Sequence, residues 1–328
     1  MFLSHYKKFL SDKPMSENVI IVNNLSKKFG SFTAVDNISF SVAEGEIFGF
    51  LGANGAGKST TIRILCGLLS PSSGSAVVAG YDVNHQAELV KTRIGYMSQK
   101  FSLYEDLTVK ENIIFYGGIY GLSNAQIEER MGWIVEMTGL SGSENRLTRE
   151  LAVGWKQRLA LGCAVIHQPR IVFLDEPTSG VDPVFRKNFW ELINQFSEQG
   201  TTIFVTTHYL DEAEYCNRLM LIHRGRIIAG GSPGELKEIY ITNPILEIEC
   251  DSALEVLEIL QKEEWVIESS IFGTYLHIMV RDELEAKHKI KKILSEKSIN
   301  LKRVDKITPG LEDVFISLIE KPEQSDRL

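Results

Sequence analysis

The clearest chemical signal in the chain is the run Gly52-Ala-Asn-Gly-Ala-Gly57-Lys58-Ser59, a glycine-rich segment that ends in a lysine and a hydroxyl. An apolar segment typical of a strand precedes it, and a helical pattern begins at Thr60. Glycines let backbone N–H groups curl around an anion, and the start of a helix adds further free N–H groups. The spacing therefore predicts a nucleotide phosphate site formed by Gly52, Asn54, Gly55, Ala56, Gly57, Lys58, Ser59 and Thr60.

Two of these residues have distinct expected roles. The ammonium group of Lys58 would reach the β and γ phosphates, and the hydroxyl of Ser59 would join the shell of a bound Mg²⁺. A second signal, the adjacent carboxylates Asp175 and Glu176, follows an apolar run at residues 171–174. Adjacent side chains on a strand face opposite ways. We therefore expect Asp175 to hold the metal and Glu176 to act as base toward the attacking water.

The composition limits the classes of function. The chain has 328 residues, 44% hydrophobic and 24% charged, as in a globular protein long enough for two domains. Its 35 basic and 43 acidic residues leave a net charge of −8, which gives no general electrostatic reason to expect a nucleic-acid partner. The longest charge-free stretches are too polar to cross a bilayer, so any membrane role is expected to come through a partner.

The four cysteines lie far apart in the sequence, without a CxxC pair. This pattern favours a reduced compartment over a disulfide framework or a zinc site, and we expect a cytoplasmic protein. The residues are Cys66, Cys163, Cys216 and Cys250.

The elements that must position these groups alternate between strands and helices. Short β-branched runs at residues 19–22, 46–51, 171–174 and 203–207 are separated by helical patterns, which predicts a largely parallel sheet covered by helices. From about residue 106 to 168 helical periodicity replaces the strand signal. This change predicts a helical subdomain inserted in the α/β core.

A second, smaller module is expected after the turn residues near Gly231 and Asn243-Pro244. Its pattern reads strand, helix, strand, strand, helix, strand and a final helix from about Leu311, the order of a ferredoxin-like α+β fold. The predicted organisation is an N-terminal extension at 1–18, a nucleotide-binding domain at 19–236 and an accessory domain at 245–320.

Over roughly residues 19–236 these motifs follow the order of the ATP-binding cassette (ABC) family, and the chain resembles the nucleotide-binding subunit of an ABC transporter. The resemblance implies a P-loop NTPase core that binds ATP and Mg²⁺ and hydrolyses ATP. Gln99 matches the Q-loop residue that senses Mg²⁺ and the γ-phosphate, and His208 matches the switch histidine that contacts the γ-phosphate. Residues 179–182 resemble the D-loop. Phe29 falls where the family stacks an aromatic ring on adenine, and a phenylalanine packed in the core is the alternative.

One motif departs from the family pattern. The signature Leu-Ser-Gly-Gly-Gln aligns with Leu151-Ala-Val-Gly-Trp155, and the 24 residues from Leu151 to Asp175 are the family spacing. In the family this segment begins a helix and binds the γ-phosphate of the ATP held by the opposite protomer. Here an alanine removes the serine hydroxyl and Val153 removes the backbone freedom of a glycine, while the N–H groups remain. We expect Gly154 to bind nucleotide in trans and activity to be retained.

The resemblance also implies partners. Two cassettes, as a homodimer or a heterodimer, should close head to tail around two ATP molecules. A separate integral-membrane permease is expected to dock near residues 100–116. The ending Leu311-Glu-Asp-Val-Phe315 is similar to that of bacterial multidrug, antibiotic and polymer exporter subunits. The leading hypothesis is therefore an ATPase subunit, peripheral on the inner face of the cell membrane, that energises export.

Two alternatives stay open. The altered signature is compatible with a mainly nucleotide-binding, regulatory half of a heterodimeric pair. A soluble ABC ATPase that acts on nucleic acid or ribosomes fits less well, because the chain has a single cassette, an acidic balance and no basic arm.

Overall fold

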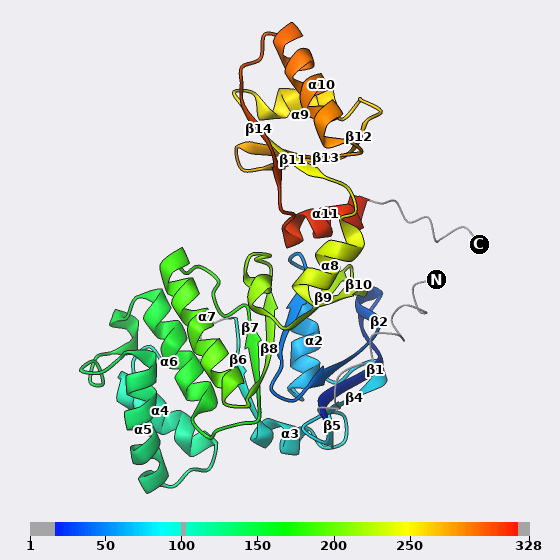
Figure 1. Ribbon diagram of the computed structural model, residues 1–328. Coiled ribbons are helices and arrows are strands. Elements are labelled where there is room, and N and C mark those ends of the chain that lie inside the picture. The colour runs from blue at the N-terminus through cyan, green and yellow to red at the C-terminus, as the bar shows by residue number, and fades with distance from the viewer. Residues whose placement is uncertain (1–16, 100–102, 321–328) are drawn as a thin grey trace. The chain divides into compact units, whose positions relative to one another are not determined.

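The computed structural model describes residues 17–99 and 103–320, and its contacts divide the chain into two compact units. The units are Met1–Gly230 and Gly231–Leu328. Most of the predicted N-terminal extension lies outside the described residues, and the first strand begins at Asn18. Figure 1 shows the elements of each unit.

The first unit contains, among its described residues, a six-stranded sheet that is largely parallel. Pairing is parallel from β9 through β3, β8 and β7 to β6, as the alternation of strands and helices predicts. In spatial order the strands are β10 (Arg226–Gly231), β9 (Arg218–His223), β3 (Ile47–Leu51), β8 (Thr202–Thr207), β7 (Ile171–Asp175) and β6 (Ile94–Met97).

The same unit holds a four-stranded antiparallel sheet, and the run at residues 19–22, which we expected in the parallel sheet, belongs to this one instead. The pairing of its two long strands shifts register several times, and the alternation of buried and more exposed residues is regular over residues 38–43 but is interrupted elsewhere in both strands. In spatial order the strands are β2 (Phe32–Ala43), β1 (Asn18–Phe29), β4 (Ser73–Val78) and β5 (Tyr81–Asp82).

Helix α2 (Lys58–Leu65) packs between the two sheets, and one buried apolar cluster joins it to strands of both. Its contribution to this core is Ile62, Ile64 and Leu65, which are fully buried. Because α2 is held on two sides, the loop that precedes it is fixed relative to the parallel sheet.

The predicted helical subdomain forms beside β6 and consists of three packed helices (Figure 1). Thr108 and Ser123 cap the first two through reciprocal bonds with Glu111 and Gln126. A bridge between Thr108 and Leu147 joins the two chain segments that lead into and out of the first two helices. The helices are α4 (Val109–Ile119), α5 (Asn124–Thr138) and α6 (Val153–Val165). The remaining helical segments of the unit are α3 (Ala87–Arg93), η1 (Thr148–Glu150), α7 (Pro183–Glu198) and η2 (Glu212–Tyr215).

The second unit has the predicted order of strand, helix, strand, strand, helix, strand and final helix. Its sheet pairs in the order β12-β13-β11-β14 and is antiparallel throughout, with an apolar core of its own. The elements are β11 (Ile245–Cys250), α9 (Ala253–Leu260), β12 (Val266–Phe272), β13 (Tyr275–Val280), α10 (Glu283–Glu296), β14 (Leu301–Ile307) and α11 (Leu311–Glu320).

The division between the units falls six residues before the predicted end of the first domain at Leu236. The difference is helix α8 (Pro233–Tyr240), which packs against α11 and therefore belongs to the second unit. The four cysteines are free thiols in buried positions. No helix within the described ranges is long and apolar enough to cross a membrane.

Candidate active site

Four neighbouring strands of the parallel sheet end at one edge, and each is followed by a predicted site residue. Leu51 at the end of β3 pairs with Thr207, Thr206 pairs with Asp175, and Leu174 pairs with Met97. The loops after these strands therefore begin side by side, as expected for the carboxyl ends of a parallel sheet. They carry the glycine-rich loop, His208, Glu176 and Gln99.

The glycine-rich loop has the backbone that its sequence predicts. Gly57 has a φ of 111°, and a Cβ atom there would lie 2.5 Å from the carbonyl oxygen of Ala34. Gly57 is also the residue before α2 and provides no side-chain cap for its first N–H groups. Lys58 Nζ donates to the carbonyl oxygens of Gly52 at 2.8 Å and Ala53 at 3.3 Å. The ammonium group is thus held inside the loop whose N–H groups would bind an anion.

Asp175 and Ser59 lie together at the end of β7. The Ser59 hydroxyl donates to Asp175 Oδ1 at 3.1 Å, and the Thr206 hydroxyl donates to the same oxygen at 2.7 Å. Burial raises the pKa of Asp175, while the two hydroxyl groups oppose that rise. Carboxylate and hydroxyl oxygens are ligands that Mg²⁺ prefers, so these residues fit the predicted metal role.

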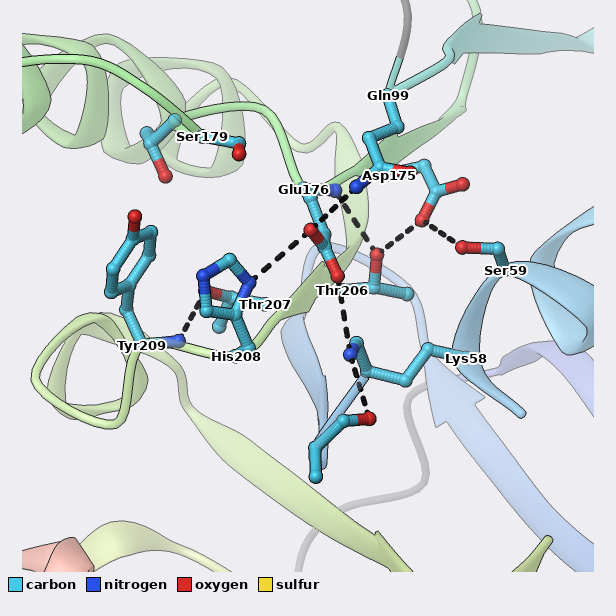
Figure 2. Close-up of polar contacts among 12 residues, drawn as sticks. Lys58, Ser59, Gln99, Asp175, Glu176, Ser179, Thr206, Thr207, His208 and Tyr209 are labelled. Atoms are coloured by element: carbon cyan, nitrogen blue, oxygen red, sulfur yellow. Dashed lines mark hydrogen bonds and ion pairs between the residues drawn. The ribbon is translucent and has the colours of Figure 1, made fainter. Parts of the chain in front are cut away.

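Glu176 is the point at which the other predicted catalytic residues meet (Figure 2). Its Oε1 is 3.2 Å from Lys58 Nζ, and its Oε2 accepts a hydrogen bond of 2.8 Å from Gln99 Nε2. His208 Nδ1 lies 3.2 Å from the same Oε2, although it is not aligned for a hydrogen bond. A single buried carboxylate therefore connects three loops of the site.

The backbone of Glu176 has an unusual conformation. Its φ is 49°, in the left-handed region that side-chain-bearing residues rarely adopt. The N–H group of Glu176 donates to the carbonyl oxygen of Thr206 at 3.0 Å and to the Thr206 hydroxyl at 3.1 Å. These bonds hold the strained residue in place, and such strain often accompanies a functional role.

Phe29 and Gly154 are not joined to the Glu176 cluster by any contact among the described residues. Phe29, at the end of β1, is 49% exposed, so it is not the packed core residue of the alternative interpretation. Lys27 Nζ lies 5.2 Å from the centre of the ring. Because the ring is exposed, it can stack on a base. Gly154 lies in the first turn of α6, away from this ring in the sequence.

The altered signature begins α6, as its alignment predicts. Ala152 is the residue before the helix and provides no side-chain cap. Val153 has no left-handed backbone, so the loss of glycine freedom that we expected there causes no strain. Gly154 is needed for a different reason, because a Cβ atom would lie 2.7 Å from the ring of Phe185.

An aromatic cluster next to the signature supports the start of α6. The rings of Trp155 and Phe185 meet edge to face at 5.5 Å, and the Arg158 guanidinium lies 5.3 Å from the Trp155 ring. Gln157 Nε2 donates to the carbonyl oxygen of Ser179 at 3.2 Å. The signature helix is thus attached to the segment that resembles the D-loop.

The sequence interpretation missed several polar residues around the site. Thr206 bonds both Asp175 and the backbone of Glu176, and the buried Glu212 bonds Thr178 and Thr207. One available signal was the pair of threonines that follows the apolar residues 203–205 at the end of β8. The partners of Glu212 depend on the folded loops and have no local sequence pattern.

Comparisons with known proteins agree with this geometry. A family model described as ABC transporter matches residues 35–179, and one described as AAA domain, putative AbiEii toxin, Type IV TA system matches residues 156–210. The linearmycin resistance ATP-binding protein LnrL of Bacillus subtilis (strain 168) is 34% identical over 303 residues, 90% of this chain and 96% of that protein.

A second relative is more similar over a shorter region. The probable multidrug ABC transporter ATP-binding protein YbhF of Escherichia coli (strain K12) is 52% identical over 221 residues, 67% of this chain but 38% of that protein. Among solved structures, an ATP binding subunit of an ABC transporter superposes with a TM-score of 0.62 at 30% identity, over 68% of this chain and 93% of that one.

Proposed function

This chain belongs to the ABC transporter family as an ATP-binding protein that hydrolyses ATP, and from this premise we propose that it powers export through a separate membrane permease. The observation that supports the ATP hydrolysis behind this role is the convergence of Lys58, Gln99 and His208 on the Glu176 carboxylate. Export is supported by the names of the relatives, one concerned with resistance to an antibiotic and one with multidrug transport.

In the proposed reaction Glu176 is the general base. It accepts a proton from the water that attacks the γ-phosphorus, and the bond between that phosphorus and the bridging oxygen of ADP breaks. Lys58 binds the phosphates, so the triphosphate replaces Glu176 as the anion beside its ammonium group. His208 and Gln99 both lie against Glu176 Oε2, and they hold the base in position relative to the γ-phosphate.

Ser59, Asp175 and Gln99 are proposed to hold Mg²⁺. When bound, the ion neutralises part of the negative charge on the phosphates. The hydrogen bond between Ser59 and Asp175 orients two oxygen ligands for the ion. The Gln99 amide contributes as well, and its nitrogen already faces Glu176.

The nucleotide-binding surface is proposed to be completed by a second cassette. The glycine-rich loop of one protomer and Gly154 of the other would enclose each ATP, with Phe29 stacked on the adenine. A regulatory role within a heterodimer is the second candidate, because Ala152 lacks the hydroxyl of the family signature. Equal ATPase rates for the isolated chain and for its mixture with any partner cassette would exclude that candidate.

A cluster of exposed apolar residues supports a docking surface for the permease on the helical subdomain. Tyr104 and Phe115 are exposed and meet edge to face at 4.6 Å, and Ile114 and Ile119 are exposed on α4 beside them. Large exposed apolar groups gathered in one place mark interaction surfaces. Residues 100–102 of the predicted docking segment lie outside the described residues. Docking there would place the chain at the inner face of the membrane, in the cytoplasm.

Purification from gently solubilised membranes tests this proposal. A tagged chain should retain an integral membrane protein, and Phe115→Asp should lose it without loss of ATP binding. Leu89→Asp is the matched control, because Leu89 is an exposed apolar residue on a different helix, α3. Failure to retain any integral protein, or equal retention by both variants, would contradict docking at this surface.

A further inference from the structure

Glu212 is a buried carboxylate that the reaction described above does not use. It begins η2, and only 1% of its surface is exposed. Its Oε1 accepts a hydrogen bond from the hydroxyl of Thr178, and its Oε2 accepts one of 2.7 Å from the hydroxyl of Thr207. A buried carboxylate is unfavourable unless its oxygens are bonded, so these two hydroxyl groups account for its position.

The two threonines lie in different loops of the active site. Thr178 follows Glu176 by two residues, and Thr207 immediately precedes His208. The Thr207 hydroxyl also accepts a 2.9 Å hydrogen bond from the N–H group of Tyr209, as Figure 2 shows. The chain on both sides of His208 is thus tied to Thr207, and through Glu212 to the loop of Glu176.

The charge of this network is balanced from α7. Arg186 Nε lies 3.4 Å from Glu212 Oε1 without the alignment of a hydrogen bond, and the guanidinium lies 4.0 Å from the Tyr209 ring. Burial raises the pKa of Glu212, while the two hydroxyl groups and Arg186 oppose the rise. The guanidinium therefore contacts both the carboxylate and the residue that follows His208.

We propose that Glu212 is a positioning residue, which holds the loop of the base Glu176 and the loop of His208 at a fixed separation through Thr178 and Thr207. The proposal rests on the roles assigned above to Glu176 and His208. Glu212 touches neither of those side chains in the described contacts, so it acts on them only through the two threonines. Its loss should slow the chemical step and leave ATP binding unchanged, because the phosphate loop is not part of the network.

Isosteric variants of the threonines provide the sharpest test. Thr178→Val and Thr207→Val keep side-chain volume and remove the hydroxyl, whereas Thr178→Ser and Thr207→Ser keep the hydroxyl. Steady-state kinetics on the full chain should show kcat reduced about tenfold in each valine variant, with KM for ATP changed less than about twofold. The serine variants should restore most of kcat. Thr138→Val is the control, since that buried hydroxyl bonds only its own helix in the helical subdomain.

A double-mutant cycle with Glu212→Gln completes the test. Because the hydroxyls act through one carboxylate, the effects of Glu212→Gln and either valine substitution should be far from additive. Additive effects would overturn the proposal. Valine variants with the kcat of Thr138→Val would also overturn it, and that comparison can be made even if Glu212→Gln fails to fold. Glu176→Gln in the same assay distinguishes failure of the base assignment from failure of this proposal. Retained turnover in Glu176→Gln would show that the base is wrongly assigned, whereas lost turnover leaves the threonine variants to decide the role of Glu212.

Discussion

Two helix starts in the first unit, those of α2 and α6, are proposed to bind the same phosphate group from opposite protomers, yet they are built differently. Neither Gly57 nor Ala152 caps its helix with a side chain, so both starts present free N–H groups. The start of α2 adds an ammonium group and a hydroxyl that are bonded within the site, whereas the start of α6 adds an exposed valine.

The difference separates two ways in which a helix can bind an anion. In the proposed site, the side chains at α2 would supply charge and metal ligands, and the backbone is shaped around them. At α6 only the backbone would face the anion, and the aromatic ring of Phe185 packs against Gly154. We therefore expect function at the start of α2 to be sensitive to the loss of side-chain groups. Function at the start of α6 should instead be sensitive to changes in packing.

The largest expected effect comes from removal of the cation at α2. Lys58→Met should weaken ATP binding by roughly a hundredfold or more, because it removes a charged partner of the phosphates and leaves Glu176 buried without its ammonium partner. Titration of the purified chain with ATP measures the affinity. Lys156→Met is the matched control, since Lys156 in α6 is paired with Glu105 outside this cluster. Equal losses in both variants would mean that α2 has no special role.

His167, two residues after the end of α6, should make the stability of the helical subdomain sensitive to acid. His167 stacks on Tyr120 at 3.6 Å and bonds the carbonyl oxygen of Ile94, and burial lowers its pKa from 6.5 to about 4. Because the folded pKa lies below the unfolded one, the stabilisation is complete above pH 6.5 and is lost as the pH falls toward 4.

This loss should reach about 3 kcal/mol of unfolding free energy at pH 4. Denaturant unfolding of the chain and of His167→Phe across that range measures it. The variant should be less sensitive to pH in this window, because the phenylalanine does not take up a proton. The same slope in both proteins would show that His167 does not contribute.

A smaller effect is expected from added volume at the start of α6. Gly154→Ala places a methyl group 2.7 Å from the Phe185 ring, which should destabilise the chain by about 1–3 kcal/mol and reduce ATPase turnover. Phe185→Leu in the same chain should recover part of both losses. Thermal unfolding and turnover of the two variants test this, and full activity in Gly154→Ala alone would show that packing does not position the signature.

The smallest effect should come from restoring the family hydroxyl. Ala152→Ser adds a cap for α6 and a hydrogen-bond donor for the phosphate, so we expect turnover to rise by a few-fold and stability by about 0.5–1 kcal/mol. Steady-state ATPase assays and unfolding curves measure the two changes. Increased stability without a change in turnover would mean that the N–H groups of α6 already suffice.

The sequence predicted much of the site because its residues stand at the ends of recognisable elements. The glycine spacing and the apolar run before Asp175 placed Lys58, Ser59 and Glu176 at neighbouring strand ends, and the pairing of β3, β8 and β7 brings these ends together. The helical subdomain and the order of elements in the second unit were also predicted, since their periodic patterns are long and regular.

The rest depended on contacts between distant parts of the chain. The strand at residues 19–22 was predicted but placed in the parallel sheet, because its antiparallel partners in β2 and β4 have no local signal. The predicted domain end at 236 falls inside α8 for a similar reason, since the packing of α8 against α11 depends on distant parts of the chain. Val153 was expected to remove the backbone freedom of a glycine, and the structure shows that the backbone there does not use that freedom. Glu212 was missed because its hydrogen-bond partners, Thr178 and Thr207, lie in two different loops that only the fold brings together.

The central claim is that Glu176 is the base of a site in which Lys58 binds the triphosphate, and the Glu176→Gln variant tests it most directly. ATP turnover and ATP affinity should be measured on the same preparation. The account predicts that turnover falls by about a hundredfold or more while affinity is kept or increased, because Lys58 loses a competing carboxylate. Turnover equal to that of the unmodified chain would contradict it.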